Sequence, residues 1–402
     1  MGMFKTIEEG IDWIQSRRNT GHTFDNFKQV CNSIGNPQNS FYTIHVAGTD
    51  GKGSTVAYLR DLLMNQGYKV GTLQSPHYIT HLDRIRINNQ NIPADIFLNI
   101  LNKNYDFFIN NDMSMFEMDY LIMCEYFKNE NIDFAIIEVG IGGRLDATNV
   151  VDNTKLSIIT TIGYDHMELL GDTLPLICKE KCGIIKNNSK VLIGHLNEEC
   201  KKVVKDVAKE KNAEYIELQE YKDLGNRQFE YEGNVYSIFS YADYQLHNAC
   251  LSLKAFNIIA KDYGINVDNE KVKYSLANTL WQNRFEIVKQ NPTVILDGAH
   301  NIHGIEAVCK SFDKFDGSKC IVFSALKRKE YKKMAETLKE HCDKLIITTF
   351  DSYGVIDIND FKMFDTNDSY IDAIDYAIKN YENVLICGSL YFLSDVVLNY
   401  RF

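Results

Sequence analysis

The chain has 402 residues, of which 45% are hydrophobic and 24% are charged, a composition typical of a globular enzyme with two or three domains. Its formal net charge of −11 argues against broad nucleic-acid binding, although a local basic cleft can still hold an anionic ligand. No stretch of the sequence approaches the ~18 consecutive apolar residues of a membrane span. The cysteines are scattered and form no Cys-x-x-Cys motif, so we expect reduced thiols and a cytoplasmic protein.

The most informative segment joins a strand to a helix through a loop rich in glycine. Residues 41–46 read as a buried strand, and the apolar residues between 56 and 63 predict one buried face of a helix that begins near residue 54. Three glycines between these elements would let backbone N–H groups turn towards an anion at the helix N-terminus, namely Gly48, Gly51 and Gly53. This arrangement is how proteins hold a nucleotide triphosphate.

The side chains of the loop favour the same interpretation. Lys52 would reach the terminal phosphates, and Ser54 or Thr55 would offer a hydroxyl to Mg2+. The match to the usual phosphate-loop pattern is not strict, because Val46 stands where that pattern has its first glycine. A glycine turn that binds nothing is therefore the alternative interpretation.

Strands rich in valine and isoleucine then alternate with amphipathic helices, which is the rhythm of a parallel sheet with helices on both faces. The strands expected in this series are 69–73, 134–139, 156–162 and 190–193. A hairpin over 228–231 and 235–239 precedes a helix over 245–262, which Gly264 would end. A second α/β series, with strands at 293–296, 320–323, 345–348 and 384–387, indicates a second domain from about residue 285.

Polar residues follow several of these strands, where ligands collect in open α/β sheets. Glu138 ends one strand, and we expect Asp165 and His166 to end the next in the same way. A surface pair of Arg144 with Asp146, a helix-capping Glu138 and a structural His166 are the alternative interpretations. After the strand 69–73, Ser75 adds a hydroxyl, and serine, glutamate and phosphate oxygens together suit Mg2+.

These motifs, in this order, identify a family. The segments that carry the similarity are 45–55, 75–77, 84–88, 138–149, 165–166, 170–173, 180–186, 284–286, 297–301 and 388–391. The chain resembles the folylpolyglutamate synthase/dihydrofolate synthase family, a branch of the Mur ligase superfamily, from about residue 40 to the C-terminus. The resemblance implies an ATP-dependent ligase that joins the amino group of L-glutamate to a carboxylate of folates, and also of dihydropteroate, through an acyl phosphate.

The resemblance also implies an architecture and a set of partners. We expect a phosphate-loop ATPase domain of the Mur ligase type, with a parallel-rich sheet, over residues 1–284, and a smaller Rossmann-like α/β domain over residues 285–402. We expect a monomer that binds small molecules, neither nucleic acid nor a membrane. The residues implied around ATP are Thr49, Asp50, Gly51, Lys52, Gly53, Ser54, Asn248, Arg284 and Asp297.

Further roles follow from the family motifs. Arg284 would meet phosphate and Asp297 the ribose, while Asp146 would face the pterin. Ser75, Glu138 and His166 are implied around Mg2+, and His300 and Ser389 near glutamate. Local sequence indicates a solvated helix lysine at position 181, whereas the family implies that Lys181 is carbamylated by CO2 and helps hold a second Mg2+. The implied catalytic residues are Lys52, Lys181 and His300.

The sequence also departs from the family pattern. Asp50 replaces the usual asparagine of the loop, Tyr244 replaces the histidine of a His-Gln pair, and Ile302 replaces a proline. Gln282 and Asn283 replace a Pro-Gly pair. These changes put nucleotide affinity, adenine contacts and interdomain linker geometry in question.

Two other functions compete with the folate ligase. A cell-wall Mur ligase would share the phosphate loop and the carbamate, but the sequence of residues 142–149 favours folate. A phosphate-loop NTPase or kinase without amide formation would have no need of the motif at 297–301.

Overall fold

The computed structural model describes residues 3–18, 21 and 23–402. Their contacts divide the chain into two compact units, one of Met1–Glu220 and Asn248–Leu276, the other of Tyr221–His247 and Ala277–Phe402. This division follows contacts, and it differs from the predicted domains 1–284 and 285–402, because the segment 221–247 contacts the C-terminal part of the chain.

The first unit is built on an eight-stranded sheet. In spatial order the strands are β4 (Gln90–Asn91), β3 (Ile85–Ile87), β2 (Val70–Leu73), β5 (Phe134–Glu138), β1 (Tyr42–Ala47), β6 (Leu156–Ile159), β7 (Lys190–Ile193) and β8 (Glu214–Glu217). Six neighbouring strands run parallel to one another, namely β2, β5, β1, β6, β7 and β8. Strands β3 and β4 add an antiparallel edge. The parallel-rich sheet predicted from the sequence is confirmed, but its short edge strands β3, β4 and β8 were not foreseen.

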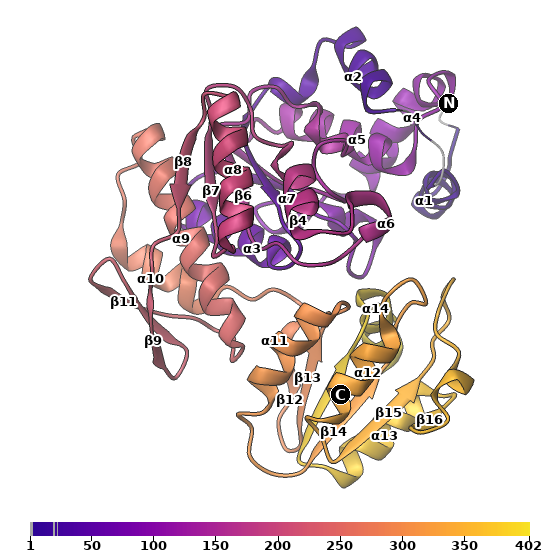
Figure 1. The fold of residues 1–402 in the computed structure, drawn as a ribbon. Coiled ribbons are helices and arrows are strands. Elements are labelled where there is room, and N and C mark those ends of the chain that lie inside the picture. Colours follow the sequence, from indigo (N-terminus) through magenta and orange to yellow (C-terminus); the bar gives the residue numbers. More distant parts are fainter. Residues whose placement is uncertain (1–2, 19–20, 22) are drawn as a thin grey trace. The chain divides into compact units, whose positions relative to one another are not determined.

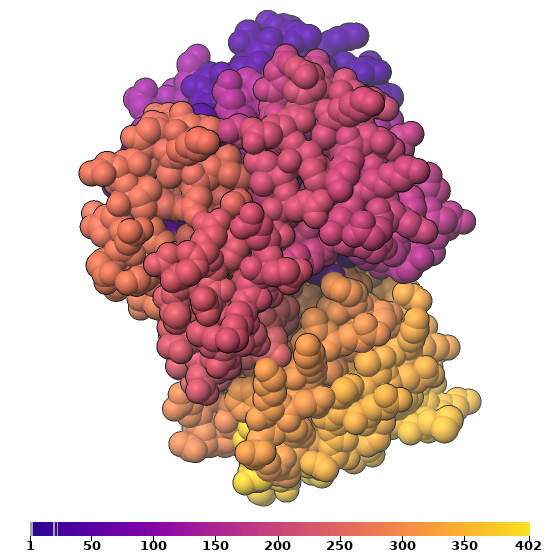
Figure 2. All heavy atoms as spheres, turned by 60° about the vertical axis from the view of Figure 1, so that its left-hand side comes forward, coloured from indigo at the N-terminus to yellow at the C-terminus, as the bar shows by residue number. Residues whose placement is uncertain are grey.

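Helices cover both faces of this sheet. They are α1 (Ile7–Ser16), α2 (Phe24–Ser33), α3 (Lys52–Asn65), α4 (Ala94–Asn110), α5 (Met115–Asn129), α6 (Met167–Leu170), α7 (Leu174–Cys182), α8 (Glu198–Glu210) and most of α9 (Asp243–Tyr263) and α10 (Asn269–Asn278), with the 3-10 turns η1 (Pro37–Asn39), η2 (His81–Arg84) and η3 (Ala147–Val150). Helix α8 buries Cys200, Val204 and Ala208 and exposes charged residues on its other side, and the part of the chain around residue 200 lies at the surface in the rose-coloured region of Figure 2. No helix among the described residues combines the length and apolar character that a membrane crossing needs.

Helix α3, which follows the glycine-rich loop, is buried more completely than its sequence predicts. Ten consecutive residues, from Gly53 to Leu62, are buried except for Asp61, so the helix is enclosed rather than covered on one face. It lies between the sheet and α9, where the Ser252 hydroxyl donates to Thr55 O at 3.1 Å. The interpretation of a one-sided amphipathic helix is therefore wrong, because a second helix covers its outer face.

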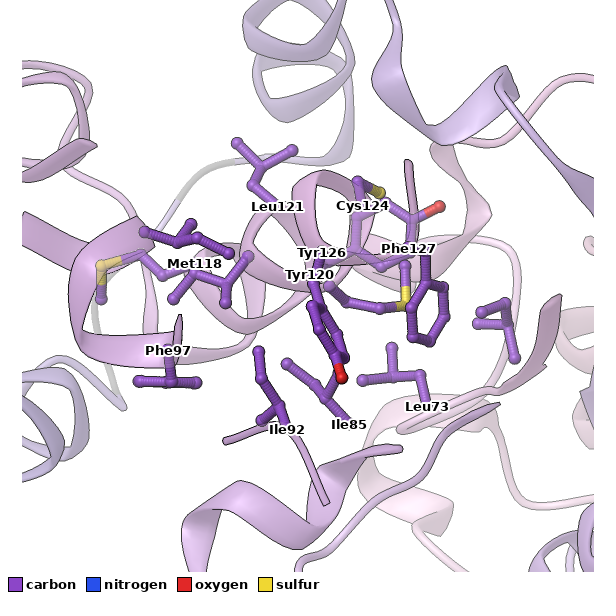
Figure 3. Packing of buried hydrophobic residues seen from close by; sticks show 14 of the residues in the cluster. Leu73, Ile85, Ile92, Phe97, Met118, Tyr120, Leu121, Cys124, Tyr126 and Phe127 are labelled. Carbon is purple, nitrogen blue, oxygen red and sulfur yellow. The ribbon is translucent and has the colours of Figure 1, made fainter. Parts of the chain in front are cut away.

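A large apolar cluster of the first unit includes residues of α5 and of the strands β2 and β3. Figure 3 shows Tyr120 and Phe127 extending from α5 towards Leu73 and Ile85. Helix α5 begins at Ser114, whose side chain and that of Glu117 form a capping box. The helix is thus fixed both at its start and along its inner face.

The second unit contains two sheets. Its three-stranded antiparallel sheet consists of β9 (Lys222–Gly225), β10 (Gln228–Tyr231) and β11 (Asn234–Ser237). The order of its six-stranded sheet is β12 (Arg284–Lys289), β13 (Thr293–Asp297), β17 (Asn383–Cys387), β14 (Lys319–Phe323), β15 (Lys344–Thr348) and β16 (Asp365–Asn367). Only β12 runs antiparallel within the described part of this sheet.

Alternate residues of each central strand enter two separate cores. Ile295, Ile321 and Leu385 belong to the core under α11 (Ile302–Phe312) and α12 (Tyr331–Lys339). Their neighbours Val294 and Val322 belong to the core under α13 (Tyr370–Asn380) and α14 (Leu390–Asn399). The C-terminal sheet therefore has helices on both faces, as the ribbon of Figure 1 shows, and the predicted Rossmann-like α/β plan is confirmed. A 3-10 turn, η4 (Ile358–Phe361), precedes the edge strand β16.

Candidate active site

The loop after β1 is fastened to the segment that follows β6. Thr49 N donates to Thr161 O at 2.8 Å, and Asp50 N donates to Thr161 Oγ1 at 3.0 Å. The Thr160 hydroxyl donates to Asp50 O at 2.6 Å. A Cβ at Gly48 would overlap this hydroxyl, so the close approach requires glycine.

Helix α9 supports the other side of the loop. Gly51, the N-cap of α3, has φ +82°, in the left-handed region that favours glycine. A Cβ at this position would meet Asn248 Oδ1 at 2.5 Å. The structure thus brings Asn248 against the predicted nucleotide loop, although the two are far apart in sequence.

Two lysines converge on one carbonyl of this loop. Lys52 Nζ donates to Gly48 O at 3.2 Å and to Thr49 O at 3.1 Å. Lys181, in the last turn of α7, donates from Nζ to the same Gly48 O at 2.8 Å. A neutral carbonyl cannot compensate two positive charges, so the arrangement is suited to an anion that would approach both side chains.

The burial of Lys181 changes its chemistry. Its side chain is 5% exposed, and burial, followed by the charge of Lys52, lowers the pKa of Lys181 to about 7. The carboxylates of Asp165 and Asp50 act in the opposite direction. The interpretation of a solvated helix lysine is therefore wrong, and the neutral amine that carbamylation by CO2 needs is accessible near neutral pH.

Close packing of the loop 140–149 against α7 positions this lysine. Arg144 N donates to Glu180 O at 2.8 Å, and Arg144 Nε lies 3.0 Å from Glu180 Oε1. A Cβ at Gly183 would overlap the backbone of Arg144, and one at Gly143 would crowd the backbone of α7. The alternative interpretation of a surface pair between Arg144 and Asp146 is wrong, since Arg144 pairs with Glu180.

Asp146 lies inside the same loop as a buried acceptor. It accepts from Ile141 N at 2.9 Å, from Thr148 N at 3.0 Å and from the Thr148 hydroxyl at 2.5 Å. Burial raises the pKa of the Asp146 carboxyl above its ordinary value. His45 Nε2 lies 2.8 Å from Thr148 Oγ1, so a hydrogen-bonded chain runs from β1 to Asp146.

The residues predicted around Mg2+ lie after three different strands. Glu138 is the buried last residue of β5, and Ser75 follows the neighbouring strand β2. His166 is the N-cap of α6, with φ +51°. The prediction that Asp165 and His166 end a strand as Glu138 does is wrong, because β6 ends at Ile159 and the following residues bond to the loop after β1.

The donor set of the predicted site is mixed. Among residues 3–18, 21 and 23–402, no three His, Cys, Asp or Glu side chains are grouped as a metal site. The predicted ligands instead combine a serine hydroxyl, a carboxylate, an imidazole and a modified lysine with phosphate oxygens. All of these groups except the imidazole are oxygen donors, which Mg2+ prefers, so the residues present fit the ion and the site stays a prediction.

In the second unit, Arg284 and Asp297 lie opposite each other. Arg284 begins β12 and Asp297 ends β13, and the two residues are paired in the antiparallel register. Asp297 accepts from Phe285 N and Ala299 N at 2.8 Å each, and from the hydroxyl of Tyr244. Burial raises the pKa of the Asp297 carboxyl, while the charge of Arg284 opposes this effect.

His300 and Ser389 follow adjacent parallel strands at the same edge. His300 comes after β13, and its Nδ1 lies 2.8 Å from Gly298 O. Ser389 comes after β17, which pairs with β13, and it caps α14 by accepting from Tyr391 N at 3.2 Å. The structure therefore gathers Arg284, Asp297, His300 and Ser389 in one unit, and the phosphate loop, Asn248 and Lys181 in the other.

Three departures from the family pattern have a structural account. Asn283 takes φ +55°, a conformation that asparagine adopts more readily than most residues, in place of glycine. Ile302 is the first residue of α11, a position that suits proline, and Asn301 still caps the helix through Gly304 N at 2.7 Å. Tyr244 fills an acceptor position of Asp297.

Sequence reasoning missed Thr160 and Thr161, whose hydroxyls hold the loop backbone at Asp50. Their signal is a pair of small hydroxyl residues directly after a buried strand, but that pair does not reveal its partner. The partner became visible only from the parallel pairing of β1 with β6.

The fold and these two groups of residues define a class of protein. The chain matches the Mur ligase middle domain over residues 46–259 and the Mur ligase glutamate ligase domain over residues 283–390. It is 32% identical to the dihydrofolate synthase/folylpolyglutamate synthase of Bacillus subtilis, over 98% of this chain and 99% of that protein. The chain therefore belongs to the dihydrofolate synthase/folylpolyglutamate synthase family of Mur ligases.

Solved structures agree with this assignment. Escherichia coli FolC in complex with ADP has a TM-score of 0.87 and 25% identity, covering 98% of this chain and 97% of that chain. FolC in complex with DHPP and ADP gives the same values. The folylpolyglutamate synthase of Mycobacterium tuberculosis, with ADP and AMPPCP, shares the fold at a TM-score of 0.87 and 24% identity, covering 98% of each chain.

Proposed function

We propose that this protein is an ATP-dependent ligase that joins L-glutamate to the carboxylate of folates and of dihydropteroate. The observation that carries the proposal is the convergence of Lys52 and Lys181 on Gly48 O, at the N-terminus of α3. Helix N-termini attract anions, and the ammonium group of Lys52 at this terminus favours a phosphate there. The family relatives bear the names of both activities.

The reaction needs a carboxylate to attack the γ-phosphate of ATP, and the two groups repel each other. Lys52 and Arg284 would neutralise this charge from the chain itself. The substrate carboxylate takes the γ-phosphoryl group to form an acyl phosphate, and ADP leaves. The amine of glutamate then attacks the acyl carbon, and phosphate leaves as the amide forms.

Ser75, Glu138 and His166 would hold Mg2+, and Lys181 carrying a carbamate would help hold a second ion. Bound Mg2+ supplies positive charge to the phosphate oxygens. The fit of Lys181 rests on its burial and on its pKa of about 7, since the neutral amine reacts with CO2 and releases a proton. Glu138 fits because a buried carboxylate is stabilised by a cation.

We assign the remaining roles by motif. The loop residues 49–54 and Asn248 would contact ATP, with Asp297 at its ribose. Asp146 would face the pterin, and the buried chain from His45 through Thr148 supports its orientation. His300 and Ser389 would lie near glutamate, with a catalytic role for His300.

We also propose functional domains of 1–284 and 285–402, because the match to the glutamate ligase domain begins at residue 283. A monomer acting in the cytoplasm is the expected state. The ten free cysteines, nine of them buried, are consistent with a reducing compartment.

The test measures phosphate release and glutamate incorporation by the purified protein with ATP and Mg2+, with dihydropteroate or tetrahydrofolate as acceptor. Incorporation on both acceptors is the expected result. Incorporation on tetrahydrofolate alone would limit the enzyme to chain extension. Phosphate release without incorporation on either acceptor would overturn the proposal in favour of another acceptor or an NTPase.

A further inference from the structure

A charged cluster lies inside the apolar core of the first unit, where the proposed reaction gives it no role. Asp119 sits on α5 between Met118 and Tyr120, two residues of the core cluster that Figure 3 shows. The side chains of Asp119 and His81 are 0% exposed, and that of Arg84 is 3% exposed. Burying such groups costs several kcal/mol each before their mutual attraction is counted, on the order given for ions in proteins.

The members of this cluster contact one another in a chain. His81 Nε2 lies 2.7 Å from Asp119 Oδ1, so the imidazole donates to the carboxylate. Arg84 Nε lies 3.7 Å from Asp119 Oδ2, an ion pair longer than a hydrogen bond. At its other end, Arg84 Nη2 lies 3.2 Å from His77 Nδ1. A guanidinium has only donors, so His77 accepts, and the chain runs from α5 to His77.

This chain of contacts belongs to the loop of residues 74–84, which also forms hydrogen bonds within itself. The Asp83 carboxylate accepts from Tyr78 N at 2.8 Å, from Ile79 N at 2.6 Å and from Thr80 N at 3.0 Å. Gln74 N donates to Arg84 O at 2.9 Å and joins the two ends of the loop. These bonds fix the internal shape of residues 74–84, whereas the His77–Arg84–Asp119 chain connects the loop to α5.

The cluster is more polar than packing requires. His81 contacts Phe97 edge to face, with ring centroids 5.9 Å apart, and a phenylalanine at position 81 would keep this contact. Replacing a buried ion pair by apolar residues of similar volume is often neutral or stabilising. A role in stability therefore does not account for a carboxylate, an imidazole and a guanidinium together. Hydrogen bonds that fix the orientation of these side chains do account for them.

We propose that His81 and Asp119 form a buried anchor that positions Arg84 and, through His77, holds the loop 74–84 in place for the ligase reaction. The anchor rests on the proposed function, because that loop carries Ser75, one of the residues proposed for Mg2+. His81 and Asp119 are positioning residues, since they act through Arg84 and do not touch substrate.

The test compares two substitutions that separate hydrogen bonding from packing. His81→Gln places an amide N–H near the position of Nε2 and can still donate to Asp119, but it loses the ring contact with Phe97. His81→Phe keeps the ring contact and removes the donor. A positioning role ranks glutamine above phenylalanine, and a packing role ranks phenylalanine above glutamine.

Two measurements test whether His81→Gln or His81→Phe retains more of the wild-type behaviour. Hydrogen exchange of the Tyr78, Ile79 and Thr80 amides should accelerate about ten-fold in His81→Phe and stay within about two-fold of wild type in His81→Gln. The Mg2+ concentration for half-maximal ligation should rise about ten-fold in His81→Phe only, with the KM for glutamate unchanged. Equal effects of the two variants, or the reverse ranking, would overturn the anchor.

A triple variant guards against a failure to fold. His81→Phe with Arg84→Met and Asp119→Leu removes the imidazole, the guanidinium and the carboxylate together and leaves an apolar core, so it should unfold at a urea concentration no lower than wild type. We expect the same fast exchange at residues 78–80 as in His81→Phe. Wild-type exchange in the triple variant would overturn the proposal. If wild-type protein ligates no glutamate, the proposed function fails, and the exchange experiment still decides the anchor.

Discussion

The two groups of predicted site residues are built on opposite electrostatic plans. In the first unit, two lysines, Lys52 and Lys181, donate to the same neutral oxygen, Gly48 O, and Lys52 donates to Thr49 O as well. In the second unit, two backbone amides and the Tyr244 hydroxyl donate to a single carboxylate, that of Asp297. The first arrangement sets amines against neutral carbonyl oxygens, whereas the second supplies neutral donors to a charged acceptor.

The two arrangements differ in what their residues do, because the first suits reaction with a ligand and the second stabilises local structure. Burial, followed by the charge of Lys52, lowers the pKa of Lys181 to about 7 and makes its neutral amine available near neutral pH. A carboxylate with three internal donors stabilises the turn that follows its strand. Substitutions in the first group should therefore act on turnover, and those in the second group first on stability.

The largest effect is expected at Lys181. Lys181→Ala should abolish glutamate incorporation, because it removes both the buried amine and the carbamate proposed on it. Short carboxylates such as acetate should restore part of the activity by supplying the missing anionic oxygens. The assay compares acetate with chloride at equal ionic strength. Full activity of the variant without acetate would contradict the assignment of Lys181.

Lys52 should follow closely. Lys52→Met keeps the length of the side chain but removes its charge, and we expect turnover to fall by about 10^3-fold, the order found for groups that stabilise a transferring phosphoryl group. Lys201→Met is the matched control, because Lys201, on α8, pairs with Glu198 of the same helix and with Glu217 of β8. Equal losses in both variants would indicate a general charge effect instead of a phosphate contact.

His45 tests the buried chain beneath Asp146 through pH. Burial, followed by the charge of Lys186, lowers the pKa of His45 to about 3. The unfolded histidine takes up a proton below pH ~6.5, while the folded one stays neutral. The unfolded state thus binds more protons between these values, so stability falls as the pH drops, by about 1.4 kcal/mol per pH unit at most.

His45→Gln should flatten this dependence, since an amide has no proton to gain. Urea unfolding at pH 4, 5 and 7 measures the slope for both proteins. Above pH 7 the two slopes should coincide. An unchanged slope in acid would show that His45 does not cause it.

The smallest effect is expected in the second unit. Tyr244→Phe removes one of the three donors of Asp297 and should lower the free energy of unfolding by about 1–2 kcal/mol, the order of one hydrogen bond to a charged group. Tyr353→Phe is the matched control, because Tyr353 is 100% exposed. A loss of turnover in Tyr244→Phe without any loss of stability would contradict the assignment of a mainly structural role to the hydrogen bonds of Asp297.

Much of the fold could be predicted from local pattern. The strands β1, β5, β7, β13, β14, β15 and β17 were expected within a residue or two, because buried parallel strands read as short apolar runs between turn residues. The length of β6 could not be read in this way. Residues 160–162 are β-branched, as strand residues often are, but they form hydrogen bonds with the end of β1 and with the loop after it.

The edge strands escaped prediction for a different reason. Strands β4 and β9 are exposed and polar, so they lack the alternation that marks a half-buried strand. Their pairing depends on a neighbour that hydrophobic pattern does not encode. The same holds for β12, which pairs antiparallel at the edge of the C-terminal sheet.

Residues close together in the chain were sufficient to predict the glycine-rich loop, the central strands and the motifs of the family. The burial of Lys181 against Gly48 O and the contact of Asp119 with His81 inside the core are visible only in the folded protein. These contacts join distant segments, and they exist because parallel pairing and helix packing bring those segments together. Side chains such as Lys181, which the sequence alone would place in solvent, are thereby buried and held by specific hydrogen bonds.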